Sequence, residues 1–196
     1  MKSNKKMKNS IQTWVRELSK VNKVPFEVMM AIIEVETPGN GFDTINGKIL
    51  IQFEPHWFKR HEPYAPSGAW SVNKVDVQSK EWIAFNNAFG INKESAMKST
   101  SIGLPQIMGF HFARLGYKTV GGMWDDFKRG EYQQVLALFR FVLTDAKLLK
   151  AVREKNYHMI AYIYNGSKYK EMAKKWGREP YDISLRKATE KWFLKR

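Results

Sequence analysis

The sequence predicts a mostly α-helical protein of the α+β class, with a small β element near residues 42–56. Apolar residues recur at three- and four-residue spacing through most of the chain, as they do on the buried face of a helix. The 196 residues contain no internal repeat and no linker long enough to separate domains. We therefore expect residues 1–196 to form a single domain, with a flexible basic N-terminus over residues 1–9.

Two helices are expected near the N-terminus, at residues 11–18 and 26–35, where the apolar spacing is helical. Pro25 can begin the second helix, and the Pro38-Gly39 pair must end it. From Gln78 onward the pattern is helical almost throughout. The helices predicted there cover residues 81–88, 103–115, 124–128, 131–149, 157–164, 169–176 and 181–193.

A strand is the better prediction for residues 48–53. This short, β-branched segment follows an Asn46-Gly47 turn signal and precedes Pro55. It is the one convincing strand in the sequence, so we expect it to pair with a neighbouring loop.

The composition excludes several kinds of site. A chain without cysteine has no disulfide, no thiolate metal site and no cysteine nucleophile. The four histidines are scattered, and the sequence has no phosphate-binding loop, no dinucleotide-binding glycine motif and no H-E-x-x-H zinc helix. We therefore expect no metal and no cofactor.

The targeting signals are also negative. The longest apolar run, residues 28–33, is far shorter than the roughly 20 residues that span a bilayer, so no transmembrane helix is expected. A secretory signal peptide needs an uninterrupted apolar stretch after its basic residues. Here an amphipathic segment follows the basic N-terminus, so no such signal is expected.

The net charge of +14 is unevenly placed along the chain. Residues 1–8 contribute +4 and residues 147–196 contribute +9, which leaves +1 for everything between them. A solvated surface explains such an excess, and so does attraction to a polyanion such as nucleic acid, anionic lipid or anionic cell-wall glycan. The charge alone identifies only the sign of a partner.

Glu36 is the most informative acidic residue. On a helical wheel Glu27 and Glu34 share a polar sector, whereas Glu36 lies in the apolar arc of the last turn. Burial and the negative end of the helix dipole both raise the pKa of a carboxyl group, and a glycosidase general acid must be protonated near neutral pH. The alternative is that Glu36 bonds to turn amides or pairs with a lysine.

Four motifs occur in order along the chain: V-E-T-P-G-N-G-F at residues 35–42, K-I-L-I-Q-F-E-P-H at 48–56, S-T-S-I-G-L-P-Q-I-M-G at 99–109 and A-Y-I-Y-N-G at 161–166. Together they resemble the N-acetylmuramidase family of phage endolysins over roughly residues 20–185. The last two also resemble signatures of the wider lysozyme and lytic transglycosylase superfamily. The resemblance implies a lysozyme-like fold.

The resemblance makes Glu36 the catalytic general acid/base. It implies a glycan cleft in which backbone, amide and aromatic groups bind the sugar. The residues implied on the walls of that cleft are Gly103, Gln106 and Ile107 on one side, and Tyr164 with Asn165 on the other. Tyr164 is preferred to Tyr162 because it directly precedes Asn165.

Glu54, in the F-E-P-H motif, is a candidate for the second carboxylate that ordinary glycosidases use as a nucleophile or base. The alternative is a structural residue that shapes the cleft or orients Glu36. Asp43 is a further acidic candidate, although Asp in a turn usually bonds to its own backbone. Pro105, a departure from the family pattern, is acceptable if Gly103 and Leu104 begin a helix.

The resulting hypothesis is an endolysin that hydrolyses the β-1,4 bond between N-acetylmuramic acid and N-acetylglucosamine in peptidoglycan. A lytic transglycosylase that leaves 1,6-anhydromuramic acid ends is the first alternative. A basic helical nucleic-acid-binding protein is an alternative of another class, and it leaves the turn-rich motifs without a role. We therefore expect glycan strands as partner, and no nucleic acid.

The basic C-terminal segment is the remaining candidate for a partner contact. Apolar residues of the helix 181–193 can share one face with basic residues around it, as in helices that lie on membranes; the alternative is docking of that face on the core. We expect a monomer without a separate wall-binding domain. It would be made in the host cytoplasm and reach the cell wall through a separate pore.

Overall fold

The computed structural model describes residues 8–72 and 77–195, and the chain divides into two compact units. The first unit combines the chain up to Gly39 with the chain from Leu138 onward, and the second runs from Asn40 to Ala137. Helices dominate the described residues, with a small antiparallel sheet in the second unit. The predicted fold class is confirmed.

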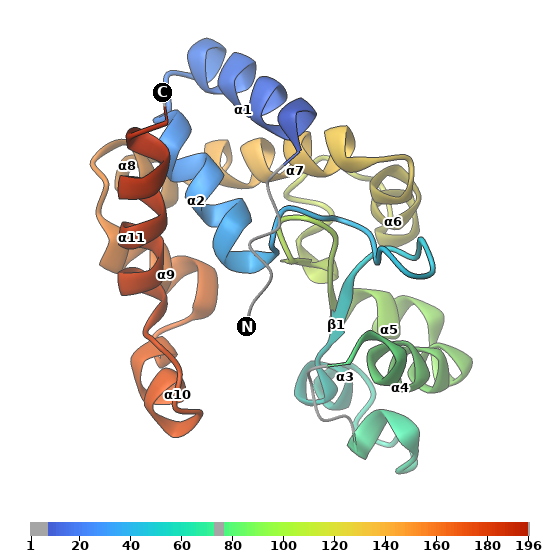
Figure 1. Cartoon of the computed structure of the whole chain (residues 1–196). Helices are drawn as coiled ribbons and strands as arrows, with labels where there is room; N and C mark the ends of the chain where they lie inside the picture. The colour runs from blue at the N-terminus through green and yellow to red at the C-terminus, as the bar shows by residue number, and fades with distance from the viewer. Residues whose placement is uncertain (1–7, 73–76, 196) are drawn as a thin grey trace. The chain divides into compact units, whose positions relative to one another are not determined.

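The regular elements described in the first unit are all helices. Its central helix is α2, in which every residue from Phe26 to Ile33 is buried. The helix α11 lies beside α2 (Figure 1) and buries Leu185, Ala188 and Trp192. The helices of this unit are α1 (Asn9–Asn22), α2 (Phe26–Glu36), the second half of α7 (Glu131–Leu143), α8 (Ala146–Arg153), α9 (Tyr157–Asn165), α10 (Tyr169–Lys175) and α11 (Tyr181–Phe193).

An ion pair inside this unit joins α2 to the turn after α8. Glu27 is fully buried, and its Oε1 lies 2.8 Å from Nζ of Lys155. A buried carboxylate is tolerated when a cation pairs with it. Glu27 is therefore part of the packing of α2 and does not lie on a solvated helix face.

The second unit contains the sheet, whose strand order is β1-β2-β3. Ile51 on β1 is opposite Ile102 on β2, which is in turn opposite Ile107 on β3. An isolated bridge joins Phe42 to Ile49. The elements of this unit are β1 (Ile51–Phe53), α3 (Pro55–His61), η1 (Ala69–Val72), α4 (Gln78–Ile91), α5 (Lys93–Lys98), β2 (Thr100–Ile102), β3 (Ile107–Met108), η2 (Gly109–His111), α6 (Val120–Lys128) and the first half of α7.

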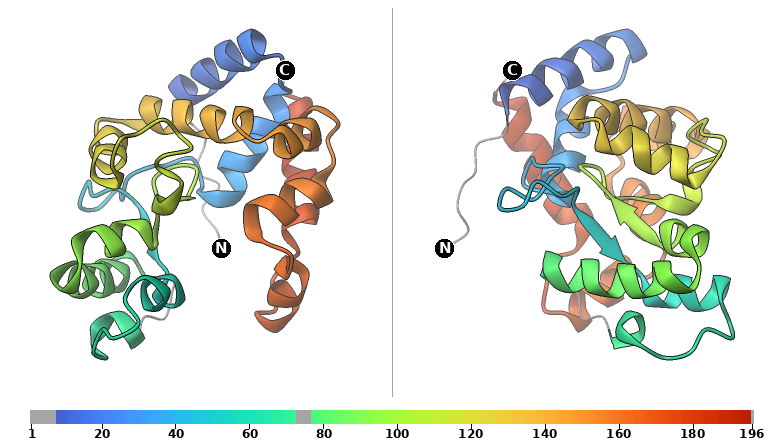
Figure 2. Two further views of the ribbon diagram at one scale, coloured as in Figure 1. Left: turned by 180° about the vertical axis from the view of Figure 1, so that it is seen from behind. Right: turned by 90° about the vertical axis from the view of Figure 1, so that its right-hand side faces the viewer.

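Helix α4 lies against β1 (Figure 2), and two of its side chains bond to the backbone of this strand. The Gln78 amide accepts from Ile51 N–H at 3.1 Å and donates to Ile51 C=O at 2.8 Å. The Glu81 carboxylate accepts from Phe53 N–H at 2.8 Å. The backbone groups of an edge strand need partners when they are buried, and α4 provides them.

Three sequence predictions of local structure are corrected. Residues 103–115 are not a helix, because Gly103 and Gln106 have positive φ values of 71° and 48° and form the turn between β2 and β3. The predicted helix 131–149 is two helices, because the Asp145 side chain caps the start of α8. The helix predicted over residues 124–128 begins earlier, at Val120, so the Gly121-Gly122 pair lies inside α6.

The remaining boundaries differ less. The predicted strand 48–53 is shortened to Ile51–Phe53, and the short helices α3 and α5 had not been predicted. Asn9 begins α1, and residues 1–7 of the predicted flexible N-terminus lie outside the described residues. No helix in the described part of the chain has the length and apolarity to span a membrane.

Candidate active site

Glu36 is the last residue of α2, where the chain turns away into Thr37 and Pro38. Its Oε1 accepts a hydrogen bond of 2.6 Å from the hydroxyl of Tyr181, the first residue of α11. The packing of α11 along α2 brings these two helix ends together. Among the residues that the structure describes, the partner of Glu36 is thus a phenol, and neither a turn amide nor a lysine.

Burial raises the pKa of Glu36 to about 7, and the hydrogen bond from Tyr181 acts in the opposite direction. Desolvation disfavours the charged form of a carboxyl group. A protonated Glu36 is therefore available near neutral pH, as a general acid requires.

Tyr164 and Asn165, the last two residues of α9, lie in the same cluster. The Tyr164 ring stacks on that of Tyr181, with centroids 6.1 Å apart and planes inclined by 13°. The side chain of Asn165 is hydrogen-bonded to Tyr181. Tyr162, by contrast, is 47% exposed. Three residues singled out in the sequence, Glu36, Tyr164 and Asn165, are therefore brought together in the first unit.

The two tyrosines stay protonated in this cluster. Burial is the main reason that the pKa values of Tyr164 and Tyr181 lie well above the usual one, and the charge of Glu36 adds to the effect. Tyr181 can thus act as a hydrogen-bond donor to Glu36 throughout the neutral range.

Glu34, two residues before Glu36, has different surroundings. Its Oε2 accepts a 2.6 Å hydrogen bond from the indole N–H of Trp192, and its Oε1 pairs with Lys191. Both partners belong to α11, so Glu34 fixes that helix to α2.

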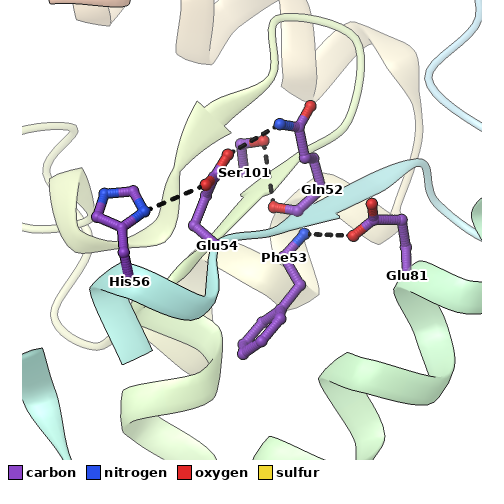
Figure 3. Close-up of polar contacts among 6 residues, drawn as sticks. All are labelled: Gln52, Phe53, Glu54, His56, Glu81 and Ser101. Atoms are coloured by element: carbon purple, nitrogen blue, oxygen red, sulfur yellow. Dashed lines mark hydrogen bonds and ion pairs between the residues drawn. The ribbon is translucent and has the colours of Figure 1, made fainter. Parts of the chain in front are cut away.

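Glu54 follows β1 in the second unit and precedes α3 (Figure 3). Its Oε1 accepts a 2.8 Å hydrogen bond from the Gln52 amide, and its Oε2 lies 3.4 Å from Nδ1 of His56. Burial raises the pKa of Glu54, the Gln52 hydrogen bond opposes this shift, and the charge of Glu81 adds to it. Its side chain is still 26% exposed, so solvent and a substrate can reach it.

Gln106 lies in the turn between β2 and β3, and its side chain is bonded within that hairpin. Its Nε2 donates to the Gly103 carbonyl at 2.7 Å, and its Oε1 accepts from the Ser101 hydroxyl at 2.9 Å. Ile107 is buried at 2% exposure, so its side chain belongs to the core. These contacts account for Gln106 and Ile107 without a bound sugar.

Gly103 is required by packing as well as by its φ angle. A Cβ at this position would lie 2.8 Å from Oε1 of Gln134 and 3.0 Å from the Phe127 ring. The fully buried Gln134 uses this space to accept from Leu104 N–H at 2.7 Å and to donate to the Phe127 carbonyl at 2.9 Å. The place on a wall of the glycan cleft that the resemblance implies for Gly103 is therefore not needed to explain the glycine.

The predicted site residues thus fall into two groups. Those of the first unit form one cluster around Glu36, and those of the second lie at the end of β1 and in the β2–β3 hairpin. Asp43 bonds to the Ile45 N–H at 2.8 Å and to Asn46, the backbone role typical of a turn. The most important residue that the sequence pattern did not reveal is Tyr181, which was expected only as part of an amphipathic face.

Comparisons with known proteins agree with these observations. The sequence model of the Muramidase family, described as N-acetylmuramidase, matches residues 25–193. The crystal structure of Burkholderia AP3 phage endolysin is similar over 93% of this chain and 70% of its own, with 30% identical residues and a TM-score of 0.75. None of the curated proteins compared gives a match.

Proposed function

Because this chain belongs to the N-acetylmuramidase family, we propose that Glu36 is the general acid with which it cleaves peptidoglycan. The enzyme is a glycoside hydrolase, and its substrate is the glycan strand of the bacterial cell wall. The observation that carries the assignment of Glu36 is its place at the end of an apolar helix, hydrogen-bonded to Tyr181 beside the Tyr164 ring, where burial raises its pKa.

The proposed reaction begins with protonated Glu36. Its proton passes to the oxygen of the β-1,4 bond between N-acetylmuramic acid and N-acetylglucosamine while the bond from that oxygen to the muramic acid C1 breaks. The carboxylate that remains then accepts a proton from the water that adds to C1. Tyr164 and Asn165, beside Glu36 in the first unit, are proposed to contact the sugar.

Glu54 is proposed as the second carboxylate of the reaction, with Gly103, Gln106 and Ile107 as further candidates for glycan contact. Glu54 is partly exposed, and each of its carboxylate oxygens has a polar partner, Gln52 on one and His56 on the other. These contacts support a role in which the carboxylate is held in one orientation. The buried side chain of Ile107 leaves mainly its backbone for such a contact.

The biological role that we propose is lysis of a bacterial host by an endolysin, and the likeness to the AP3 phage endolysin supports it. On this proposal the protein is made in the host cytoplasm and reaches the wall through a separate pore. The family match extends through both units, which supports their working as one catalytic domain. We propose that this domain acts as a monomer.

The decisive experiment measures the lysis of purified sacculi by the variant Glu36→Gln. We expect lysis to fall by roughly a hundred- to ten-thousandfold while the circular dichroism spectrum stays unchanged, because glutamine cannot donate a proton. The matched control is Glu34→Gln, on the same helix, whose amide oxygen can still accept from Trp192. Near-normal turnover by Glu36→Gln would refute the assignment.

The masses of the products distinguish hydrolysis from the transglycosylase alternative. Hydrolysis leaves reducing muramic acid ends, whereas transglycosylation leaves 1,6-anhydro ends that are lighter by one water. The family match favours hydrolysis, and it also disfavours a nucleic-acid-binding protein, since it gives the turn-rich motifs a catalytic context.

A further inference from the structure

A second polar cluster lies in the first unit and is not used by the proposed mechanism. Tyr169, on α10, is only 5% exposed. Its hydroxyl lies 2.7 Å from Nδ1 of His158 on α9 and is hydrogen-bonded to the carboxylate of Asp182 on α11. One buried hydroxyl therefore connects three helices.

Asp182 is held firmly at the start of α11. Besides the Tyr169 hydroxyl it contacts Nζ of Lys170 at 3.3 Å, and its Oδ1 accepts from the Ile183 N–H at 3.0 Å. Burial works against its charge, but Tyr169 and Lys170 keep the pKa of Asp182 below the usual value. Asp182 is thus an ionised anchor for the first turn of α11.

The residue next to this anchor is Tyr181, the donor to Glu36. We propose that Tyr169 and Asp182 are positioning residues for the reaction: they fix the first turn of α11 so that the Tyr181 hydroxyl is aimed at the Glu36 carboxylate. The proposal rests on the proposed role of Glu36.

The direction of the Tyr181 O–H matters because negative charge develops on Glu36 during the reaction. When the Glu36 proton moves to the glycosidic oxygen and the C–O bond breaks, a negative charge remains on the Glu36 carboxylate. The O–H of Tyr181 stabilises that charge, and a hydrogen bond to a charged group is stronger than one to a neutral group. In the described part of the chain, the titratable groups that bear on Glu36 are Tyr181 from α11 and Tyr164 from α9, and both are neutral in this range.

The direct test removes the donor. In Tyr181→Phe we expect kcat on sacculi to fall roughly tenfold or more with little change in KM, because the lost interaction forms fully only as charge develops. The alkaline limb of the pH–rate profile should move upward by up to about one pH unit, since the Tyr181 hydrogen bond lowers the pKa of Glu36.

Tyr169→Phe tests the positioning itself. It removes one hydroxyl from the second cluster and leaves Tyr181 and Glu36 unchanged. We expect the alkaline limb to move upward by less than in Tyr181→Phe, and kcat to fall about three- to tenfold. Adding Tyr169→Phe to the Tyr181→Phe variant should cause no further shift, because the donor that Tyr169 positions is then absent. Asp182→Asn should reproduce the effect of Tyr169→Phe.

Tyr117→Phe is the matched control. Tyr117 belongs to the second unit and donates a 2.8 Å hydrogen bond to Asp126, so the same hydroxyl is lost from the same kind of pair. Its pH profile should equal that of the wild type. A ¹³C NMR titration of Glu36 in each folded variant measures the pKa independently of catalysis.

The possible outcomes separate this inference from the assignment of Glu36. An unchanged Glu36 pKa and alkaline limb in Tyr169→Phe and Asp182→Asn would overturn the inference, whatever happens to kcat. Retained activity of Glu36→Gln would instead overturn the proposed function. An inactive Glu36→Gln together with unshifted Tyr169→Phe would leave the proposed function standing and remove only the positioning role.

Discussion

Glu34 and Glu36 lie two residues apart on α2 and have opposite electrostatic surroundings. Glu34 has a cation and an indole N–H as partners, whereas Glu36 has one neutral phenol. Glu34 therefore joins α11 to α2, whereas the burial of Glu36 favours the protonated form that its proposed role as general acid needs.

The raised pKa of Glu36 should make the free energy of unfolding depend on pH. Its pKa is about 7 in the folded chain and close to 4.5 when unfolded, so the folded state binds the proton more tightly between these values. This contribution to stability is complete below pH 4.5 and is lost as pH rises through 7. Glu36→Gln should therefore raise stability at pH 8 by of order 2 kcal/mol relative to wild type, and hardly change it at pH 4.

Urea unfolding of wild type and Glu36→Gln at the two pH values measures this difference. Glu34→Gln serves as the control, with no comparable gain at pH 8. An equal effect of Glu36→Gln at both pH values would show that the folded protein does not perturb this carboxyl group.

Gln52 offers a test of the role of Glu54. Gln52→Met removes the hydrogen bond that lowers the pKa of Glu54, so this pKa should rise further. A nucleophile or base must be ionised, and the acidic limb of the pH–rate profile should accordingly move to higher pH. An acidic limb that stays in place, together with normal folding, would indicate that Glu54 has a structural role only.

At this scale the sequence could predict Glu36 but not its partner. The apolar arc of α2 and the turn after it are local patterns, and they are enough to indicate a buried carboxyl group at a helix end. Tyr181 is 145 positions away, and no periodicity relates two helices that distant in sequence. The pairing follows from the packing of α11 on α2, which only the folded structure gives.

The β2–β3 hairpin shows how an element can be mistaken from sequence. Its apolar residues Leu104 and Ile107 are three positions apart, as in a helix, and both are buried. The positive φ angles of Gly103 and Gln106 instead turn the chain back on itself. Periodicity records which residues are buried, and here a tight turn buries them as well as a helix would.

Gly103→Ala should lower the free energy of unfolding by more than the cost of the positive φ angle alone. A positive φ costs an L-residue about 1 kcal/mol, and the clash with Gln134 should add roughly 1–3 kcal/mol. Gly47→Ala is the matched control, because Gly47 has a φ of 70° and nothing in the described part of the chain lies within 4 Å of the place that its Cβ would take. Thermal unfolding of both variants measures the difference, and equal losses would contradict the packing role.

The apolar face of α11 packs on the core of the first unit, which is the alternative to a helix that lies on a membrane. Leu185, Ala188 and Trp192 are buried against the rest of the first unit, so most of its apolar face is occupied. Phe193 and Leu194, near its end, are exposed. A contact of this segment with anionic lipid or wall polymer stays a prediction and would depend on its basic residues.

At the scale of the whole molecule, the net charge of +14 already counts every carboxylate, including those that pair with lysines of the first unit. Lys170, Lys187 and Lys191 each contact a carboxylate of the first unit. The other basic residues of positions 147–196 keep the segment cationic. We propose that this surface increases the residence of the enzyme on an anionic cell wall.

Activity on sacculi should therefore fall as salt is added. Between about 0.05 and 0.5 M NaCl the Debye length shrinks to a few ångströms, and long-range attraction is screened. Hydrolysis of a short, soluble glycan oligomer, which carries far fewer charges than the wall, is the control and should change little. A parallel loss on both substrates would place the salt effect on catalysis and contradict a role for the net charge in wall binding.

The first unit is built from segments at opposite ends of the sequence, and this arrangement sets the order of events during synthesis. A ribosome that has just added Glu36 must add 145 further residues before Tyr181 exists. Until then Glu36 has neither its phenol partner nor the helix that helps to bury it, and it titrates as an ordinary carboxylate. The nascent chain is consequently without its proposed acid, which appears only when the late helices fold back onto α2.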